Sequence, residues 1–412
     1  VDHCCGHSGL STACWPGDLA WPGAAGRPPA RLDFNGWRPR RLMSDAYVFC
    51  CLPSLQRLTA ADTPPWMLRQ LAADALPPPP PAACADARDE TQEEEALAAY
   101  EVRGRTLRVR GGQGFVNMHL ALAKAILLLL QAGAELPNGT FHVWDGELWP
   151  LWSAGGFRGR RAGGSCRRIL ANTRMQWAAP GTLLLPDWCY LADEARRRFD
   201  AVLRTQHSLP GFHGLADKLW WRGSPTHHWR SEPTAKLLLK HPRFILVRLS
   251  EQFPSLIDAR FTSKGRLDNW TQRVLEERGL LADYVHDMES QLSYRYLIDV
   301  DGSSESKRLF WSLLAPGVLL KPESPIQSWA NRMLEPWVHY VPVQRDLGDL
   351  VARLEWARKH LRECREISQA ATRLAVERLG QQSALAYVFH ALRRYAEWRG
   401  GAGAAPGGSG PG

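Results

Sequence analysis

The hydrophobic positions of the chain fall into short apolar runs separated by amphipathic stretches once the sequence passes residue 96. The runs have strand length and predict strands at 141–144, 183–185, 218–221, 244–247, 296–300, 317–320 and 338–341. The spacing between them predicts helices at 120–132, 193–204, 271–277, 306–314 and 328–334. Strands that alternate with helices are typical of parallel sheets, so we expect two doubly wound α/β domains.

The two ends of the chain differ from this central part in composition and hydrophobic pattern. Residues 1–95 contain the polyproline run Pro77–Pro81 and an acidic stretch up to Glu95, which predicts a mostly irregular N-terminal arm. Residues 347–398 are long, charged and amphipathic without a strand signal, and predict a helical C-terminus. We expect domains at 96–210 and 211–375, a C-terminal helix at 376–399 that packs back toward the first domain, and a flexible tail at 400–412.

Composition excludes some classes of protein. The 412 residues are 45% hydrophobic, which excludes a fully disordered chain. Lys and Arg total 51 against 42 Asp and Glu, a net charge of +9, but the basic residues are spread out. A nucleic-acid-binding function would rest on this charge alone, since no compact basic-aromatic module accompanies it. The most apolar run, Ala125–Leu130, is too short for a membrane span, which needs about 20 residues.

The termini and cysteines give little direct information on localisation. The chain starts with Val and shows no signal peptide, so we expect a fragment that lacks its targeting segment. Sequons at Asn138 and Asn269 give weak support for a secretory lumen. Six of the nine cysteines lie in the arm without a CxxC pair, which does not favour zinc and leaves disulfides or free thiols open.

The polar loop from Arg222 to Arg230 directly follows a predicted strand. Its glycine lets a backbone approach a ligand closely, Ser224 offers a hydroxyl, and its two arginines offer planar forks. This combination suits a phosphate or a diphosphate. The same residues also fit a surface turn with exposed arginines.

A second polar loop, Asp301–Arg308, leads from a predicted strand into a predicted helix. Backbone N–H groups and the dipole at a helix N-terminus favour an anion, and Lys307 and Arg308 add positive charge. Its serines also fit helix caps, which is compatible with anion binding. Asp299 and Asp301 match a DxD metal motif, although a structural aspartate pair is the alternative. P-loop, HExxH and GxSxG motifs are absent.

Four ordered segments resemble glycosyltransferase family 90, which includes protein O-glucosyltransferases and capsule-associated xylosyltransferases. They are Trp220-Trp-Arg-Gly-Ser-Pro-Thr226, Tyr294-Arg-Tyr-Leu-Ile-Asp-Val-Asp-Gly302 with Lys307-Arg308, Leu319-Leu-Lys-Pro-Glu-Ser324, and Glu335-Pro-Trp-Val-His-Tyr-Val-Pro-Val343. Pro186-Asp-Trp188 is similar to an earlier segment of the family. The resemblance extends over residues 96–398 and is strongest over 218–357.

The resemblance implies a GT-B fold, in which two Rossmann-like domains face a cleft and the second binds the donor. It implies an inverting enzyme that transfers glucose or xylose from a UDP-sugar to a hydroxyl of a protein or glycan, in the endoplasmic reticulum or Golgi lumen. No metal is expected to be required, which argues against the DxD reading. The donor-binding residues carried over are Ser224, Arg230, Ser303, Ser304, Glu305, Ser306, Lys307 and Arg308. Two further donor-binding candidates come from the residues themselves: Arg222, from its polar loop, and Glu323, which follows a predicted strand and is a candidate for the donor ribose.

The catalytic base departs from the family pattern. An inverting transfer needs a group that deprotonates the acceptor hydroxyl, and in the family this is an aspartate just before an aromatic-proline pair. If Trp149-Pro150 is that pair, the position is occupied by Leu148. Glu147 is the first candidate to replace the aspartate and Asp145 the second. The alternative is a weak or inactive protein that binds a sugar nucleotide or a glycan on the same fold.

Overall fold

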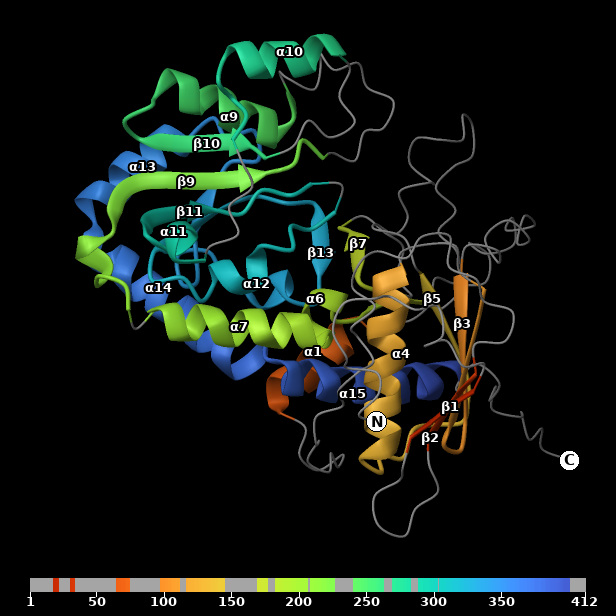
Figure 1. The fold of residues 1–412 in the computed structure, drawn as a ribbon. Helices are drawn as coiled ribbons and strands as arrows, with labels where there is room; N and C mark the ends of the chain where they lie inside the picture. Colours follow the sequence, from red (N-terminus) through yellow and green to blue (C-terminus); the bar gives the residue numbers. More distant parts are fainter. Residues whose placement is uncertain are drawn as a thin grey trace, which may run out of the picture. The chain divides into compact units, whose positions relative to one another are not determined.

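The computed structural model describes residues 18–21, 30–33, 64–74, 97–111, 116–144, 169–176, 182–206, 208–226, 240–262, 269–282, 288–302 and 304–400. The chain divides into two compact units (Figure 1). The first unit is Val1–Glu194 together with Gln381–Gly412, and the second is Ala195–Gly380. The expected boundaries were at residues 210 and 375, whereas α14 (Leu361–Arg378) and all but the first two residues of α7 (Asp193–Gln206) lie in the second unit.

The first unit is built on a mixed seven-stranded sheet, whereas parallel strands were expected. Its order is β1 (Asp18–Trp21), β2 (Ala30–Asp33), β4 (Thr106–Gly111), β3 (Leu97–Arg103), β5 (Gly139–Trp144), β6 (Ile169–Ala171) and β8 (Thr182–Leu184). Strands β3 and β4 form an antiparallel hairpin, because Gly104 has a φ of 55° and closes a two-residue turn between them. Strands β5, β6 and β8 are parallel. The short strand β7 (Thr173–Met175) follows β6.

The helices of the first unit that lie in the described ranges are α1 (Pro65–Asp74), α4 (Val116–Gln131), α6 (Trp188–Leu191) and α15 (Gln381–Gly400). Residues 119–130 of α4 are all buried, as expected for a helix that is apolar all round, and the helix contacts both α6 and α15. The helix expected at 120–132 is thereby confirmed, as are the strands expected at 141–144 and 183–185. The described parts of the expected arm, β1, β2 and α1, all belong to this unit.

The second unit has a five-stranded sheet in which every pair is parallel. Its order is β10 (Ile257–Phe261), β9 (Ala216–Gly223), β11 (Tyr294–Ile298), β12 (Val318–Pro322) and β14 (Val341–Val343). The remaining elements are η4 (Phe212–Gly214), α9 (Pro242–Gln252), α10 (Asn269–Glu277), α11 (Met288–Leu292), α12 (Leu309–Ser312), β13 (Ile326–Ser328), η5 (Asn331–Met333) and α13 (Leu350–Lys359). In Figure 1, α9 lies next to β10 and α10 lies beyond α9, while α13 and α14 lie on another side of the sheet.

One expected strand of the second unit is a helix. Residues Phe244–Val247 were expected as a strand, but they lie inside α9. Pro242 occupies the first turn, where a missing N–H costs nothing, and the His241 side chain caps the helix by accepting from Arg243 N. The four apolar residues are all buried, because an apolar run of this length fits a buried helix as well as a buried strand.

Three other expectations were wrong in extent. The helix expected at 306–314 contains only the four residues of α12, so the helix dipole behind the Asp301–Arg308 loop is weaker than expected. The helix expected at 328–334 is the single turn η5. The strand expected at 338–341 begins only at Val341, after a turn in which Trp337 has a φ of 64°.

The α/β fold class with a helical C-terminus is confirmed. Each unit has its own sheet, and the C-terminal stretch forms α13, α14 and α15. The apolar side chains of the parallel sheet form one core with those of the helices on it, including the buried Trp221, Tyr296 and Leu354. Among the helices that the structure describes, none combines the length and the apolarity of a membrane span.

Candidate functional site

The order of the parallel sheet predicts where its ligand binds. The chain passes from β9 outward to β10, and then returns to place β11 on the other side of β9. In open parallel sheets ligands bind beyond the carboxyl ends of the strands, where the strand order reverses. The loops that leave β9 and β11 are the two polar loops of the sequence analysis, so the topology brings them together.

Arg243, in the first turn of α9, ties these two loops to each other. Its Nη1 donates to the carbonyl of Ser224 at 2.8 Å and to Oγ1 of Thr226 at 2.7 Å. On the other side, its Nε donates to the carbonyl of Asp301 at 2.9 Å and its Nη2 to that of Val300 at 3.0 Å. The residue is 8% exposed. A single buried guanidinium therefore clamps both loops, and we call this arrangement the Arg243 clamp.

Gly302 packs directly against the clamp. A Cβ atom at this position would lie 2.6 Å from Oγ1 of Thr226 and 2.8 Å from Nη2 of Arg243. Both distances are shorter than a carbon atom tolerates. The glycine is therefore required for space, whereas its φ lies outside the positive region that only glycine adopts easily.

Arg308 closes the second loop against the end of β9. Its Nη2 donates to the carbonyl of Arg222, and its guanidinium lies over the ring of Trp221, with its carbon 5.4 Å from the ring centroid. The hydroxyl of Ser306 accepts a hydrogen bond from the backbone N–H of Arg308 at 3.3 Å. Ser306 and Ser304 are buried, while Lys307 and Arg308 are partly exposed. The structure thus brings Ser224 and Arg308 to neighbouring loops at the end of β9.

Arg222 is held by a different partner. Its side chain forms an ion pair with Asp258 of β10, with Nη1 3.0 Å from Oδ1, and donates to the carbonyl of the same residue at 3.0 Å. The guanidinium also stacks on Trp220. The described hydrogen bonds of this side chain therefore join the two strands at the sheet edge, and its expected contact with the donor stays a prediction.

Two buried carboxylates lie just before the second loop and within it. Asp299 pairs with Lys321 of β12, and the Nζ–Oδ2 distance is 2.8 Å. The buried Asp299 carboxylate holds the pKa of Lys321 above its usual value, although burial acts in the opposite direction. Glu305 is 4% exposed and accepts a hydrogen bond from the hydroxyl of Ser328. Burial raises the pKa of Glu305 to about 7.

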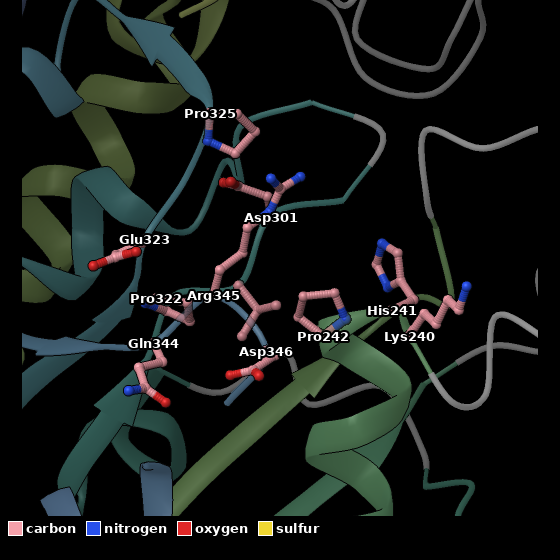
Figure 2. A pocket seen from close by; sticks show the side chains of 11 residues that line it. Lys240, His241, Pro242, Asp301, Pro322, Glu323, Pro325, Gln344, Arg345 and Asp346 are labelled. Atoms are coloured by element: carbon pink, nitrogen blue, oxygen red, sulfur yellow. The ribbon is translucent and has the colours of Figure 1, made fainter. Parts of the chain in front are cut away.

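A pocket of about 680 Å³ opens at the same carboxyl edge of the sheet. Its lining includes Asp301 after β11, Glu323 after β12, Arg345 and Asp346 after β14, and Lys240 before α9. Figure 2 shows Lys240 and His241 on one side of the pocket, and Glu323 and Gln344 on the other. The volume lies within the roughly 300–1,000 Å³ of small-molecule sites.

The pocket contains carboxylate groups that suit a polyhydroxylated ligand. One oxygen of Asp301 accepts from the hydroxyl of Ser324, and the other is buried with no hydrogen-bond partner among the described residues. Glu323 is exposed, with its backbone N–H held by Val343. The described residues contain no cluster of three or more potential metal ligands. Carboxylates of this kind can accept hydrogen bonds from ribose or sugar hydroxyls.

Four of the residues expected in the site lie outside the described residues: Asp145, Glu147, Arg230 and Ser303. Their roles stay predictions. Conversely, sequence reasoning missed Arg243 and Ser328, and it assigned no role to Lys321, although this residue lies in one of the segments that resemble the family. The signal for Arg243 was the His241-Pro242 pair before it, which marks a helix start and places the arginine in the first turn.

Comparison with known proteins identifies relatives of both units. A family model, Glycosyl transferase family 90, matches residues 183–400, a range that contains the whole second unit. Protein O-glucosyltransferase 3 of Mus musculus is 27% identical over 278 residues, which cover 66% of this chain and 50% of that protein. Protein O-glucosyltransferase 2 of Danio rerio is 25% identical over 311 residues, 73% of this chain and 56% of that protein. The chain thus spans about half the length of the curated relatives it matches.

A solved structure has a weaker likeness. The crystal structure of HepE from Anabaena in complex with UDP-glucose covers 69% of this chain and 76% of its own, with 11% sequence identity and a TM-score of 0.39.

Proposed function

Because the chain belongs to glycosyl transferase family 90, we propose that it is an inverting glycosyltransferase that uses a UDP-sugar as donor. The sugar is glucose or xylose, and the acceptor is a hydroxyl of a protein or glycan. The names of the relatives, protein O-glucosyltransferases, support glucose and a protein acceptor. The donor is bound by the second unit and needs no metal ion.

The observation that carries this proposal is the convergence of two cation-bearing loops and a pocket at one sheet edge. The Arg243 clamp holds both loops at the strand-order reversal, and Asp301 belongs to one loop and also to the pocket lining. We place the nucleoside in the pocket, with Glu323 accepting from a ribose hydroxyl. The diphosphate lies toward Lys307 and Arg308, whose positive charge matches it.

In the proposed reaction, a carboxylate takes the proton of the acceptor hydroxyl while the oxygen attacks the anomeric carbon of the donor sugar. The bond from this carbon to the diphosphate oxygen breaks, and UDP leaves with the electron pair. Arg308 stabilises the negative charge that grows on the leaving group. Attack from the face opposite to the leaving group inverts the configuration. Glu147 is the proposed base, and Asp145 the second candidate.

A titration with UDP tests the donor site. Arg308→Met keeps the aliphatic length of the side chain and removes its charge. A hydrogen bond to a charged group contributes about 1.5–3 kcal/mol, so we expect the Kd for UDP to rise about 10- to 100-fold. Arg278→Met makes the same change in net charge at an exposed ion pair with Glu251, and should leave the Kd unchanged. Equal affinities of wild type and Arg308→Met would refute the assignment.

Turnover distinguishes an enzyme from a protein that only binds. UDP release is measured with UDP-glucose and with UDP-xylose, in the presence of an acceptor. If Glu147 is the base, Glu147→Gln loses most of the activity and keeps its UDP affinity, while Asp145→Asn loses little. The presence of Leu148 at the family's aspartate position favours the second candidate function, a sugar-nucleotide-binding protein without catalysis. That function predicts UDP binding, no UDP release and no effect of Glu147→Gln.

We also propose that the protein works in the lumen of the endoplasmic reticulum or Golgi, as expected for enzymes that modify secretory proteins. The test is protease protection of the full-length protein in isolated microsomes. Digestion without detergent would contradict a lumenal location.

A further inference from the structure

Glu305 belongs to the loop proposed to bind the donor diphosphate, yet its own carboxylate points to a different partner. The residue is 4% exposed, and its Oε1 accepts a hydrogen bond from the hydroxyl of Ser328, the last residue of β13. Arg308, three residues later, is partly exposed at the end of β9. One end of the segment 304–308 is therefore attached to β13, and the other end to β9.

Ser328 is itself fixed by Asn331. Its backbone N–H donates to Oδ1 of Asn331 at 2.8 Å, and its Oγ accepts from the backbone N–H of Asn331 at 3.1 Å. Nδ2 of Asn331 donates to the carbonyl of Ile326 at 2.8 Å. Because the serine oxygen already accepts one hydrogen bond, its single proton is directed to Glu305. This partner set orients the hydroxyl of Ser328 as a hydrogen-bond donor toward the side-chain oxygen of residue 305.

Three charged groups surround Glu305. Lys321 lies on β12, Asp299 follows β11, and Lys307 lies on the same loop as Glu305. Lys321 and Asp299 are already paired at 2.8 Å, so the charge of Lys321 is largely neutralised by its direct partner. An ionised Glu305 therefore adds a net negative charge within the loop that is proposed to bind a diphosphate.

We propose that Glu305 is a positioning residue, which fastens the segment 304–308 to β13 in its protonated form and weakens donor binding when it loses its proton. This inference rests on the proposed function for its effect on the donor. Two physical effects act in the same direction. A buried carboxylate gains hydration if the loop moves outward, and its negative charge repels the diphosphate.

The pKa of Glu305 determines where this change occurs. Burial raises it to about 7, against the opposing influence of Ser328 and Lys321. A folded-state pKa above the ordinary value of 4.5 means that the folded protein favours the protonated acid. The fastened state is therefore complete at acidic pH and is lost as the pH rises through about 7.

The test compares UDP affinity at pH 6 and pH 8 in wild type and in Glu305→Gln. Glutamine keeps the size and the acceptor oxygen but cannot ionise. UDP itself titrates in this range, so the quantity of interest is the ratio of the two Kd values at each pH. We expect a ratio near one at pH 6, and a wild-type Kd about tenfold above that of the variant at pH 8, which corresponds to about 1.4 kcal/mol. A ratio that does not change with pH would overturn the proposal.

Two further variants separate the proposal from a general charge effect. Glu355→Gln removes one carboxylate at an exposed position of α13 and should show no pH-dependent ratio. Ser328→Ala removes the hydrogen bond that lowers the pKa of Glu305, so the fall in affinity should move to higher pH. A merely structural role of Ser328 would reduce affinity without moving this midpoint.

A second measurement does not depend on UDP. Hydrogen exchange of the amides at 304–308, corrected for the intrinsic effect of pH, should lose protection between pH 6 and pH 8 in wild type and keep it in Glu305→Gln. Equal loss in both proteins would refute the fastening role. If UDP does not bind at any pH, the proposed function is wrong, while the exchange experiment still decides the role of Glu305.

Discussion

Replacing Gly302 with alanine is expected to destabilise the second unit, although the backbone there accepts any residue. The added Cβ would lie 2.6 Å from Oγ1 of Thr226, about 0.8 Å inside the 3.4 Å at which ordinary contact begins. It would also lie 2.8 Å from Nη2 of Arg243. Thr226 is itself bound by Arg243 at 2.7 Å, so neither neighbour can move without disturbing the Arg243 clamp.

The magnitude follows from three contributions. Overpacking in a well-filled interior costs about 1–3 kcal/mol. If the guanidinium shifts enough to lose one of its four hydrogen bonds, a further roughly 1.5–3 kcal/mol is lost. Alanine restricts the unfolded chain more than glycine does, which returns about 0.4–1 kcal/mol. The net expectation for Gly302→Ala is a loss of about 1.5–5.5 kcal/mol in the free energy of unfolding.

Equilibrium unfolding in guanidinium chloride measures this loss. The matched control is Gly211→Ala, because a Cβ at Gly211 has no neighbour within 4 Å and the residue has an ordinary φ of −56°. The control should be neutral or slightly stabilising. In a Thr226→Ala background, where the shorter of the two contacts is removed, Gly302→Ala should cost at least about 1 kcal/mol less. A Gly302→Ala protein as stable as the parent would refute the account of the clamp.

Three other perturbations test the same unit and the first. Asp299→Asn should lower the free energy of unfolding by about 3–5 kcal/mol, because it leaves the buried ammonium of Lys321 without its anion. In denaturant unfolding, the double variant with Lys321→Met should recover part of this loss. Additive losses from the two substitutions would contradict the pairing. Gly317→Ala should lower the free energy of unfolding by about 3 kcal/mol or more, because its Cβ would lie 2.5 Å from the backbone oxygen of Tyr294, which cannot rotate away. A soluble Gly317→Ala protein with an unchanged melting temperature would argue against this. Burial lowers the pKa of His390 to about 4, so the folded protein disfavours the protonated imidazole. The free energy of unfolding should therefore be constant above about pH 6.5 and fall as the pH drops toward 4. His390→Gln should flatten this part of the curve of unfolding free energy against pH, and parallel curves for the two proteins would contradict this account.

The strands that lead into the site could be predicted from the sequence because each joins an apolar run to a polar turn. Such runs lie within β9, which ends at Gly223, and β11, which ends at Ile298. Strand β10 was not among the expected strands, because it contains no continuous apolar run; its Asp258 and Arg260 alternate with apolar residues, which is the pattern of a half-buried strand. Short elements whose type depends on packing, such as α9, could not be assigned from an apolar run alone.

The chemistry of the loops was accessible from the sequence, but the partners of individual side chains were not. Arg222 and Arg308 are both basic and lie near the same turn, yet one pairs with Asp258 and the other lies over Trp221. Glu305 lies two residues before Lys307, in a segment whose sequence is uniformly polar, and only its burial against Ser328 distinguishes it. These differences arise from contacts between residues distant in the sequence, which a local pattern does not contain.

The Arg243 clamp also has a consequence for how this family member could diversify. It fixes the chain at Thr226 and again at the start of α9, and it holds Val300 and Asp301 through the same guanidinium. A substitution that removes this guanidinium therefore disturbs both loops of the site at once. Position 243 can consequently change in evolution only together with the residues that it holds, whereas exposed positions of the unit are free to vary one at a time.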